Sequence, residues 1–390
     1  MVKGGGDNKL PNLLLVVQLP PPVHGASVVN EQVASSNLLR KNFRLTVVRI
    51  DATVDLAEIR KFSLAKVART FRTFALVALS LWHVRPKLAY LTMAPKGFAF
   101  YRDALLVFVF RLAQVPHVLH FHGRGMREAH LGKWSAGLVR FTLKKAVVIH
   151  LSRLLKDDIS PFVNDEQMRF VANGVADPLP NGLMQYERIL GADRVILFLG
   201  TMLESKGPMV LLDALARLKM RRFRFRALFA GPWRGSLTQE RFNDRVHQLD
   251  LADCVTHLGG VYGDEKIKIL QSADILAFPT HYENEAFPLV VLEGMAAGMV
   301  PVTSNIAALP EMIAEVGLCV PPQDPIALAD ALQSLLSNPS RLAQLQGKAR
   351  ERYLTHFTRQ RFEQKLAEVL VGAAGAETML ASDRTTEMQT

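Results

Sequence analysis

The feature that most limits the fold is a repeated alternation of short apolar runs with helical patterns. Five such runs lie in the first half of the chain: Leu13–Leu19, Leu45–Ile50, Leu88–Thr92, His117–His122 and Ala146–Leu151. Five more lie in the second half: Val195–Leu199, Arg226–Ala230, Val255–Leu258, Ile275–Phe278 and Val300–Thr303. Apolar runs that alternate with helices are typical of strands buried in parallel sheets. The sequence therefore predicts an α/β protein with two Rossmann-like, doubly wound parallel sheets.

The chain length agrees with two domains. It has 390 residues, and a domain usually takes roughly 100–200. Asn173–Asn181 gathers Asn, Gly and Pro, which favour turns and linkers. We expect an N-terminal acceptor-binding domain over residues 1–178 and a C-terminal nucleotide-sugar-binding domain over 179–350. An amphipathic helix is predicted from Arg350 to Val371, with residues 351–371 packing back toward the N-terminal domain, and residues 372–390 are expected to form a flexible tail.

Cysteine usage and hydropathy indicate a cytoplasmic protein. Cys254 and Cys319 have no metal-ligand spacing and do not make a disulfide framework. Residues 1–10 lack the apolar region of a secretory signal. The longest apolar runs, Phe74–Trp82 and Ala104–Phe110, are shorter than the ~20 residues that span a bilayer.

The positive charge is confined to the first half. Residues 1–180 contain 25 Lys and Arg against 12 Asp and Glu, whereas the remainder contains 22 against 24. A basic half favours an anionic surface, which the charge alone does not identify as membrane, nucleic acid or phosphorylated acceptor. The chain has no recognisable nucleic-acid-binding motif. Leu56–Trp82 interleaves Lys and Arg with Phe, Leu and Trp, which fits burial against the sheet with a basic edge available to anionic lipid.

One loop of the second half has the features of a phosphate site. Gly200 ends an apolar run, and Lys206 stands just before Gly207 and Pro208, where a helix is expected to begin. A lysine beside a helix N-terminus favours phosphate, because the free N–H groups and the helix dipole act in the same direction. Taken alone, however, the residue pattern favours a solvated surface lysine, which is the usual role of a lysine in a strand-to-helix loop.

A second loop brings two carboxylates. Glu285 precedes a predicted helix over Leu289–Ala297, and Glu293 lies inside this otherwise apolar helix. A carboxylate in a buried helix is costly unless something hydrogen-bonds to it. A ligand hydroxyl and a buried partner, such as an arginine, satisfy this need equally well.

These motifs together resemble retaining glycosyltransferases of family 4, which have the GT-B architecture. The resemblance rests on Glu285-x7-Glu293, on Gly294–Gly298 with Pro301-Val302, and on the loop from Gly200 to Gly207. Asn173-Gly174-Val175, Leu309-Pro310-Glu311 and the segment from Gly317 to Pro322 extend it over nearly the whole second half. It implies two Rossmann-like domains that face a central cleft, where a nucleotide diphosphate sugar binds.

The resemblance also implies roles for single residues. Glu293 would accept hydrogen bonds from the ribose, Glu285 would contact the transferred sugar, and Lys206 would neutralise the diphosphate. The remaining predicted donor-binding residues of this half are Thr201, Ala286, Phe287, Pro288 and Leu289. Many family members have Arg where this chain has Thr201, which leaves the diphosphate to Lys206 and to backbone N–H groups before Leu289.

Two positions of the first half complete the predicted site. Gly25 follows the first strand, where glycine lets the backbone approach a ligand closely, and the family's equivalent loop faces the donor. His122 ends the strand His117–His122, and the family's histidine meets the sugar there. His120, on the same face, is expected to be a core residue.

We therefore expect a retaining hexosyltransferase that moves a sugar from a UDP- or GDP-sugar to a glycan or lipid-linked acceptor in cell-surface polysaccharide biosynthesis. Its predicted catalytic residues are His122, Lys206 and Glu285, with no metal and no other cofactor. The expected location is the cytoplasm, with peripheral binding at the inner face of the plasma membrane left open. The alternatives are a GT-B sugar-nucleotide epimerase and a non-catalytic protein that binds a membrane surface.

Overall fold

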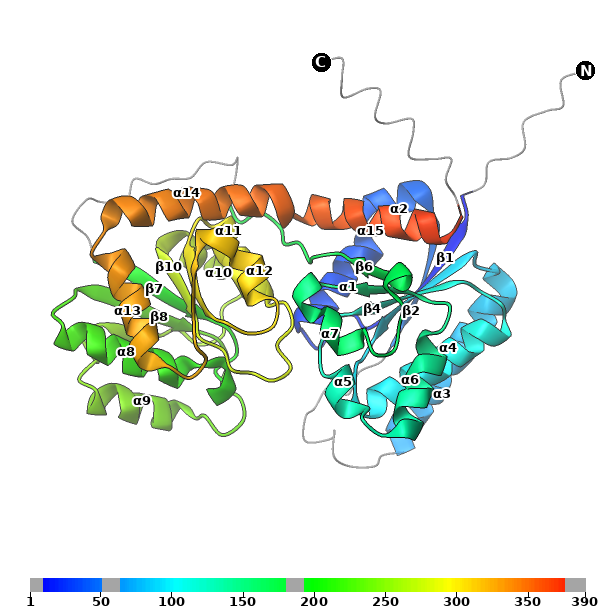
Figure 1. The fold of residues 1–390 in the computed structure, drawn as a ribbon, viewed down its shortest axis with the longest axis horizontal. Coiled ribbons are helices and arrows are strands. Elements are labelled where there is room, and N and C mark those ends of the chain that lie inside the picture. Colours follow the sequence, from blue (N-terminus) through cyan, green and yellow to red (C-terminus); the bar gives the residue numbers. More distant parts are fainter. Residues whose placement is uncertain (1–9, 51–63, 180–192, 376–390) are drawn as a thin grey trace, which may run out of the picture. The chain divides into compact units, whose positions relative to one another are not determined.

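The structure, a computed structural model, describes residues 10–50, 64–179 and 193–375 (Figure 1). These residues form two compact units: one runs to Ala172 and resumes at Phe362, and the other is Asn173–Arg361. Each unit contains one six-stranded sheet whose neighbouring strands are all parallel. The predicted α/β class with two parallel sheets is confirmed.

The strands of the first unit follow the order β2-β1-β3-β4-β5-β6. Their bounds are β1 Asn12–Val17, β2 Arg44–Arg49, β3 Leu88–Met93, β4 His117–Phe121, β5 Val147–His150 and β6 Met168–Phe170. The central strands β1, β3 and β4 are buried almost along their whole length, as expected for a sheet covered on both faces. The short edge strand β6 was not predicted, because its three residues have Arg169 at the centre and form no apolar run.

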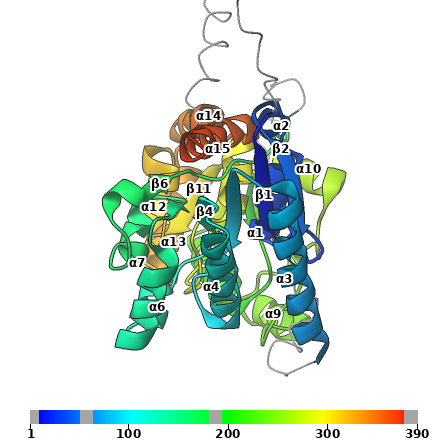
Figure 2. The ribbon, with the colours of Figure 1, turned by 90° about the vertical axis from the view of Figure 1, so that its right-hand side faces the viewer.

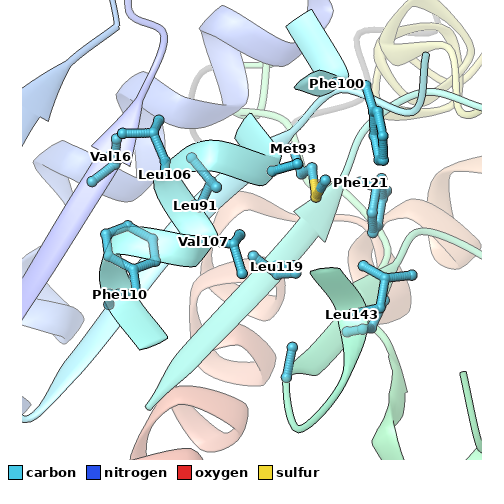
Figure 3. Close-up of a cluster of buried hydrophobic side chains, with 14 of the residues drawn as sticks. Val16, Leu91, Met93, Phe100, Leu106, Val107, Phe110, Leu119, Phe121 and Leu143 are labelled. Atoms are coloured by element: carbon cyan, nitrogen blue, oxygen red, sulfur yellow. The ribbon is translucent and has the colours of Figure 1, made fainter. Parts of the chain in front are cut away.

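The helices of the first unit are α1 Gly25–Ser35, α2 Asn37–Asn42, α3 Leu64–Val84, α4 Gly97–Leu112, α5 Met126–Ala129, α6 Lys133–Leu143 and α7 Lys156–Ile159. Short 3₁₀ turns cover Arg153–Leu155 and Asp165–Gln167. Figure 3 shows part of the core, in which Val107 of α4 lies close to Leu119 of β4. Because α4 buries side chains on the sheet, this core fixes the carboxyl end of β4, where the predicted site residue His122 follows.

The strands of the second unit follow the order β12-β11-β10-β7-β8-β9. Their bounds are β7 Arg194–Leu199, β8 Phe225–Ala230, β9 Val255–His257, β10 Ile275–Phe278, β11 Val300–Ser304 and β12 Leu318–Val320. The order reverses at β7 and β10, which are neighbours in the sheet although β8 and β9 lie between them in the chain. Ligands of doubly wound folds bind where the strand order reverses in this way.

The helices of the second unit are α8 Pro208–Met220, α9 Gln239–Gln248, α10 Gly263–Ser272, α11 Leu289–Ala296, α12 Leu309–Ile313, α13 Pro325–Leu336 and α14 Pro339–His356. Short 3₁₀ turns cover Glu204–Lys206 and Ala314–Val316. Pro208 is the first residue of α8, as predicted.

The predicted single helix from Arg350 to Val371 is wrong as one element. Helix α14 ends at His356, and α15 covers Arg359–Ala373. Between them the chain pairs with Val175, whose N–H donates to the Phe357 carbonyl at 3.0 Å and whose carbonyl accepts from Arg359 N at 2.9 Å. Two hydrogen bonds to a distant segment replace helical ones, which a pattern of apolar residues does not reveal.

Three sequence-based expectations concern residues outside the described part of the chain. These are residues 1–9 of the start, residues 56–63 of the basic segment and residues 376–390 of the expected tail. Residues 180–181 of the predicted linker also lie outside it. Within the described residues, every helix is too short or too polar to cross a membrane.

Candidate active site

The candidate site of the second unit is built on a close contact between two loops. Gly207 ends the loop after β7 with a φ of +87°. A Cβ atom at this position would lie 2.1 Å from the carbonyl oxygen of Pro279, which follows β10. Only glycine fits such a backbone, because other residues would meet both conformational strain and a clash. The two loops at the switch point of the sheet are therefore held in direct contact.

Backbone hydrogen bonds reinforce this contact. The carbonyl of Ser205 accepts from the N–H of His281 at 2.8 Å and from the Thr280 hydroxyl at 3.3 Å. Because Ser205 precedes Lys206 directly, these bonds fix the backbone from which the lysine side chain extends.

Lys206 and Glu285 form an ion pair at this contact. Lys206 Nζ donates to Glu285 Oε2 at 2.5 Å, and the two side chains are 19% and 9% exposed. The ammonium also lies 4.6 Å from the centre of the Tyr282 ring, within cation–π range. The structure thus brings two predicted catalytic residues together, with the lysine charge held in a largely dry setting.

The predicted donor-binding segment leads directly into α11. Ala286, Phe287 and Pro288 are buried, and Leu289 is the first helical residue. No side chain caps this helix start. First-turn N–H groups have no partner inside the helix, so this N-terminus suits an anionic group.

Glu293 has a partner that the sequence did not indicate. Its Oε1 accepts from Lys266 Nζ of α10 at 2.7 Å. Burial raises the pKa of the Glu293 carboxyl, and the nearby Lys266 ammonium opposes this increase. The sequence left open whether a ligand hydroxyl or a protein side chain satisfies this carboxylate. The structure provides a protein side chain, that of Lys266. No motif marks Lys266, because it lies on an amphipathic helix with another lysine two residues away.

The second oxygen of Glu293 remains unsatisfied. Oε2 is buried and has no hydrogen-bond partner among the described residues. A buried carboxylate oxygen without a partner is costly, so such atoms call for a ligand or an ordered water. Glu293 is therefore only half engaged by the described residues, with one buried oxygen left unpaired.

Thr201 lies half-buried in the loop between β7 and α8. The loop is tight here, because Thr201 O accepts from Leu203 N at 2.8 Å. Lys206 is the cation of this loop, since the threonine brings no charge.

In the first unit, His122 follows the end of β4, and its ring lies against the ring of His120 at a tilt of 36°. Their ring centres are 4.1 Å apart, and His120 is fully buried with its Nδ1 2.7 Å from the Tyr90 hydroxyl. Both ring nitrogens of His122 are buried and have no partner in the described structure. Burial, with repulsion from His150 and His24, lowers the pKa of His122 to about 3. The imidazole is therefore uncharged at neutral pH and suited to a neutral hydrogen bond.

Gly25 is the first residue of α1. His24 caps this helix together with Ser27, whose N–H donates to His24 Nδ1 at 3.3 Å. A Cβ atom on Gly25 would meet nothing within 4 Å, and its φ is not positive. Neither packing nor backbone strain of the described residues requires glycine here, which leaves space at the helix start.

The comparison with known families concerns the second unit. Residues 184–352 match the family model described as Glycosyl transferases group 1. The second unit carries a group 1 glycosyl transferase domain.

Curated relatives agree with this family. The chain is 32% identical to a D-inositol 3-phosphate glycosyltransferase of Corynebacterium diphtheriae, over 51% of this chain and 48% of that protein. It is 31% identical to the D-rhamnosyltransferase WbpZ of Pseudomonas aeruginosa, over 48% of this chain and 47% of that protein. The chain thus spans about half the length of these relatives.

Solved structures extend the likeness to both units. A glycosyltransferase from Rickettsia africae superposes with a TM-score of 0.73 at 18% identity, covering 94% of this chain and 99% of that one. The structure of HepE from Anabaena in complex with UDP superposes with a TM-score of 0.71, also at 18% identity, covering 93% and 100%. This likeness confirms the predicted GT-B fold.

The loop contact at Gly207 predicts a glycine requirement. We expect Gly207→Ala to lower the stability of the glycosyl transferase domain by more than ~1 kcal/mol, because of its positive φ and the Pro279 carbonyl. Gly347→Ala is the matched control: Gly347 lies in α14, where a Cβ atom meets nothing within 4 Å. This change should stabilise by about 0.5–1 kcal/mol. Urea unfolding midpoints measure both, and equal shifts of the two variants would contradict the proposed loop contact.

The buried histidines predict acid sensitivity of the first unit. The pKa values of His122, His120 and His150 lie below the usual 6.5, at about 3 for His122 and about 4 for His150. Between these values and 6.5 the unfolded chain binds more protons, so stability falls as the pH decreases. Each histidine contributes a slope of up to about 1.4 kcal/mol per pH unit.

His122→Gln should reduce the pH dependence of the unfolding free energy by up to about 1.4 kcal/mol per pH unit, the contribution of one histidine. Urea unfolding between pH 4 and pH 7 measures the slope. A ring of His122 that titrates near pH 6.5 by NMR would contradict the burial argument.

Proposed function

We propose that this protein is a retaining glycosyltransferase that takes a sugar from a nucleotide diphosphate sugar. The observation that carries the proposal is the buried, unpartnered Oε2 of Glu293, on a helix whose start is open to an anion. A vicinal pair of ribose hydroxyls supplies the donors that this oxygen lacks. The group 1 match and the names of the relatives support the same chemistry.

The diphosphate would bind between Lys206 and the start of α11. Lys206 is paired with Glu285 in the free protein, so binding exchanges one anionic partner of the ammonium for another. Glu285 is then released to accept hydrogen bonds from hydroxyls of the transferred sugar. The N–H groups at the start of α11 and the hydroxyls of the transferred sugar would hydrogen-bond to the anionic groups that the single ammonium does not neutralise.

The reaction would proceed on one face of the sugar. The bond between C1 and the diphosphate oxygen breaks while the acceptor oxygen forms a new bond to C1 from the same side. The proton of the acceptor hydroxyl passes to the departing diphosphate oxygen. Lys206 and the N–H groups of α11 stabilise the negative charge that develops on the leaving group.

The first unit would contribute hydrogen bonds without charge. His122 has two buried nitrogens without partners and is neutral at pH 7, so it would bind a hydroxyl rather than a phosphate. The space at Gly25 would admit the donor close to the backbone of α1. The acceptor we propose is a glycan or a lipid-linked sugar of a cell-surface polysaccharide.

A panel of nucleotide sugars tests the donor. A UDP- or GDP-sugar at a hundred times its dissociation constant should stabilise the protein by about 2.7 kcal/mol in a thermal-shift measurement. The product formed with that donor should keep the anomeric configuration, as measured by NMR. An inverted anomer would contradict the mechanism, and donor turnover without any acceptor would indicate an epimerase instead.

Glu293 and Lys266 should act together on donor affinity. We expect Glu293→Gln and Lys266→Met each to weaken donor binding by roughly 10–100-fold, the usual effect of a hydrogen bond to a charged group. Lys268→Met is the matched control, because Lys268 lies on the same helix and is exposed. Calorimetric titration with the donor measures all three. If Lys268→Met weakens binding as much as Lys266→Met, the general positive charge of α10 is responsible, and not the pair with Glu293.

A further inference from the structure

The outward face of α4 carries a continuous apolar stripe. Its exposed large residues recur at alternating intervals of three and four: Phe98, Tyr101, Leu105, Phe108 and Leu112. This spacing places them along one side of the helix. The opposite side is equally apolar and is buried, with Phe100, Val107 and Phe110 in the core. Packing on the sheet therefore explains one side of α4 and leaves the other without a function in the fold.

The neighbouring helices extend this stripe into a surface. Figures 1 and 2 show α3, α4 and α6 side by side in the first unit, and contacts join α4 to each of the other two. Exposed on these flanking elements are Phe71, Leu79 and Trp82 of α3, Leu131 before α6, and Trp134 and Phe141 of α6. Trp134 is 95% exposed and Trp82 is 76% exposed. We call these residues together with the α4 stripe the apolar face.

An apolar face of this kind indicates an interaction. Soluble proteins rarely expose contiguous apolar patches larger than a few hundred Å². Tryptophan and tyrosine are also enriched where one end of a side chain meets lipid and the other meets water.

The charge around the apolar face selects its partner. Residues 64–145 contain 14 Lys and Arg against two acids, Asp103 and Glu128. Asp103 is fully buried and paired with Arg102, which removes it from the surface. Cations also touch the apolar face itself, because Arg111 lies 4.3 Å from the centre of the Phe141 ring. A second copy of this chain would present the same positive charge, which disfavours self-association through this face.

We propose that the apolar face binds the surface of a lipid bilayer that contains anionic headgroups. Aromatic and aliphatic side chains of α3, α4 and α6 enter the interface, while the surrounding Lys and Arg contact the headgroups. This proposal goes beyond the proposed transfer reaction and does not depend on it, because vesicle binding is measured without donor or acceptor.

The chain contains its own reporters of binding. Of its three tryptophans, Trp82 and Trp134 lie on the apolar face and Trp233 lies in the second unit. In the Trp233→Phe variant, vesicles of phosphatidylglycerol should shift the fluorescence to shorter wavelength as the indoles leave water. Vesicles of phosphatidylcholine alone should give little shift, and added salt should reduce the binding. The protein should also float with the anionic vesicles in a density gradient.

Two sets of variants separate the apolar and the electrostatic contributions. Leu105→Ser with Leu112→Ser should weaken anionic vesicle binding at least tenfold, by loss of buried apolar area. Arg72→Gln, Lys133→Gln and Lys144→Gln combined should weaken it on the order of 100-fold. The matched controls lie on the second unit: Met220→Ser with Ile326→Ser, and Lys268→Gln, Arg341→Gln and Lys348→Gln combined, all exposed positions. Urea midpoints equal to that of the unchanged protein show that the variants are folded.

Several outcomes would overturn the proposal. These are absence of flotation with pure phosphatidylglycerol at low salt, equal binding to phosphatidylcholine, and control variants as impaired as the face variants. A dimer in analytical ultracentrifugation that dissociates on Leu105→Ser with Leu112→Ser would assign the apolar face to a second copy of the chain. If the unchanged protein binds the anionic vesicles but transfers no sugar from any nucleotide sugar, that result would count against the proposed function and not against the membrane proposal.

Discussion

The close contact between the loops after β7 and β10 is the constraint on which the candidate site depends. Gly207 allows the backbone of one loop to approach the Pro279 carbonyl of the other, and the Ser205 carbonyl accepts two hydrogen bonds across the same contact. Lys206 lies in the short 3₁₀ turn Glu204–Lys206, whereas the loop from Pro279 to Phe287 has no helix or strand, so the contact supports both loops. Joined, they place Lys206 against Glu285 at the switch point of the sheet. The backbone contact between the two loops thus determines where the side chains of Lys206 and Glu285 lie.

The candidate site of the second unit contains two lysine–glutamate ion pairs, which differ in how fully each carboxylate is hydrogen-bonded. Lys206 and Glu285 satisfy each other inside a largely buried pair, which a ligand must open. Lys266 engages only one oxygen of Glu293 and leaves the other buried without a partner. Under the proposed function, an anion would replace the carboxylate of the first pair, whereas the second pair would offer its buried, unpartnered oxygen to hydroxyl donors. A ligand with an anionic centre and a neutral hydroxylated end matches this difference.

The sequence predicted those parts of the fold that local pattern determines. Central strands are buried on both faces, so their apolar runs were located within a few residues, and Gly207, Pro208, Glu285 and Glu293 were recognisable from spacing. Lys266 was not, since its importance depends on which helix packs beside α11 and nothing on α10 distinguishes it from Lys268. The break between α14 and α15 depends likewise on pairing with Val175. What the sequence missed are relations between distant segments, which no local period encodes.

The basic character of the first half has its physical origin at the surface and not at the histidines. His122, His120 and His150 are uncharged at neutral pH because burial lowers the pKa of each, so they add nothing to the positive field. The exposed lysines and arginines around α3, α4 and α6 provide it, next to apolar side chains that the sheet does not cover. A positive surface whose only task was solubility would not need the exposed Trp82 and Trp134 of its flanking helices. An anionic bilayer interface suits both features, because its headgroups contact the lysines and arginines while its acyl chains bury the aromatic rings.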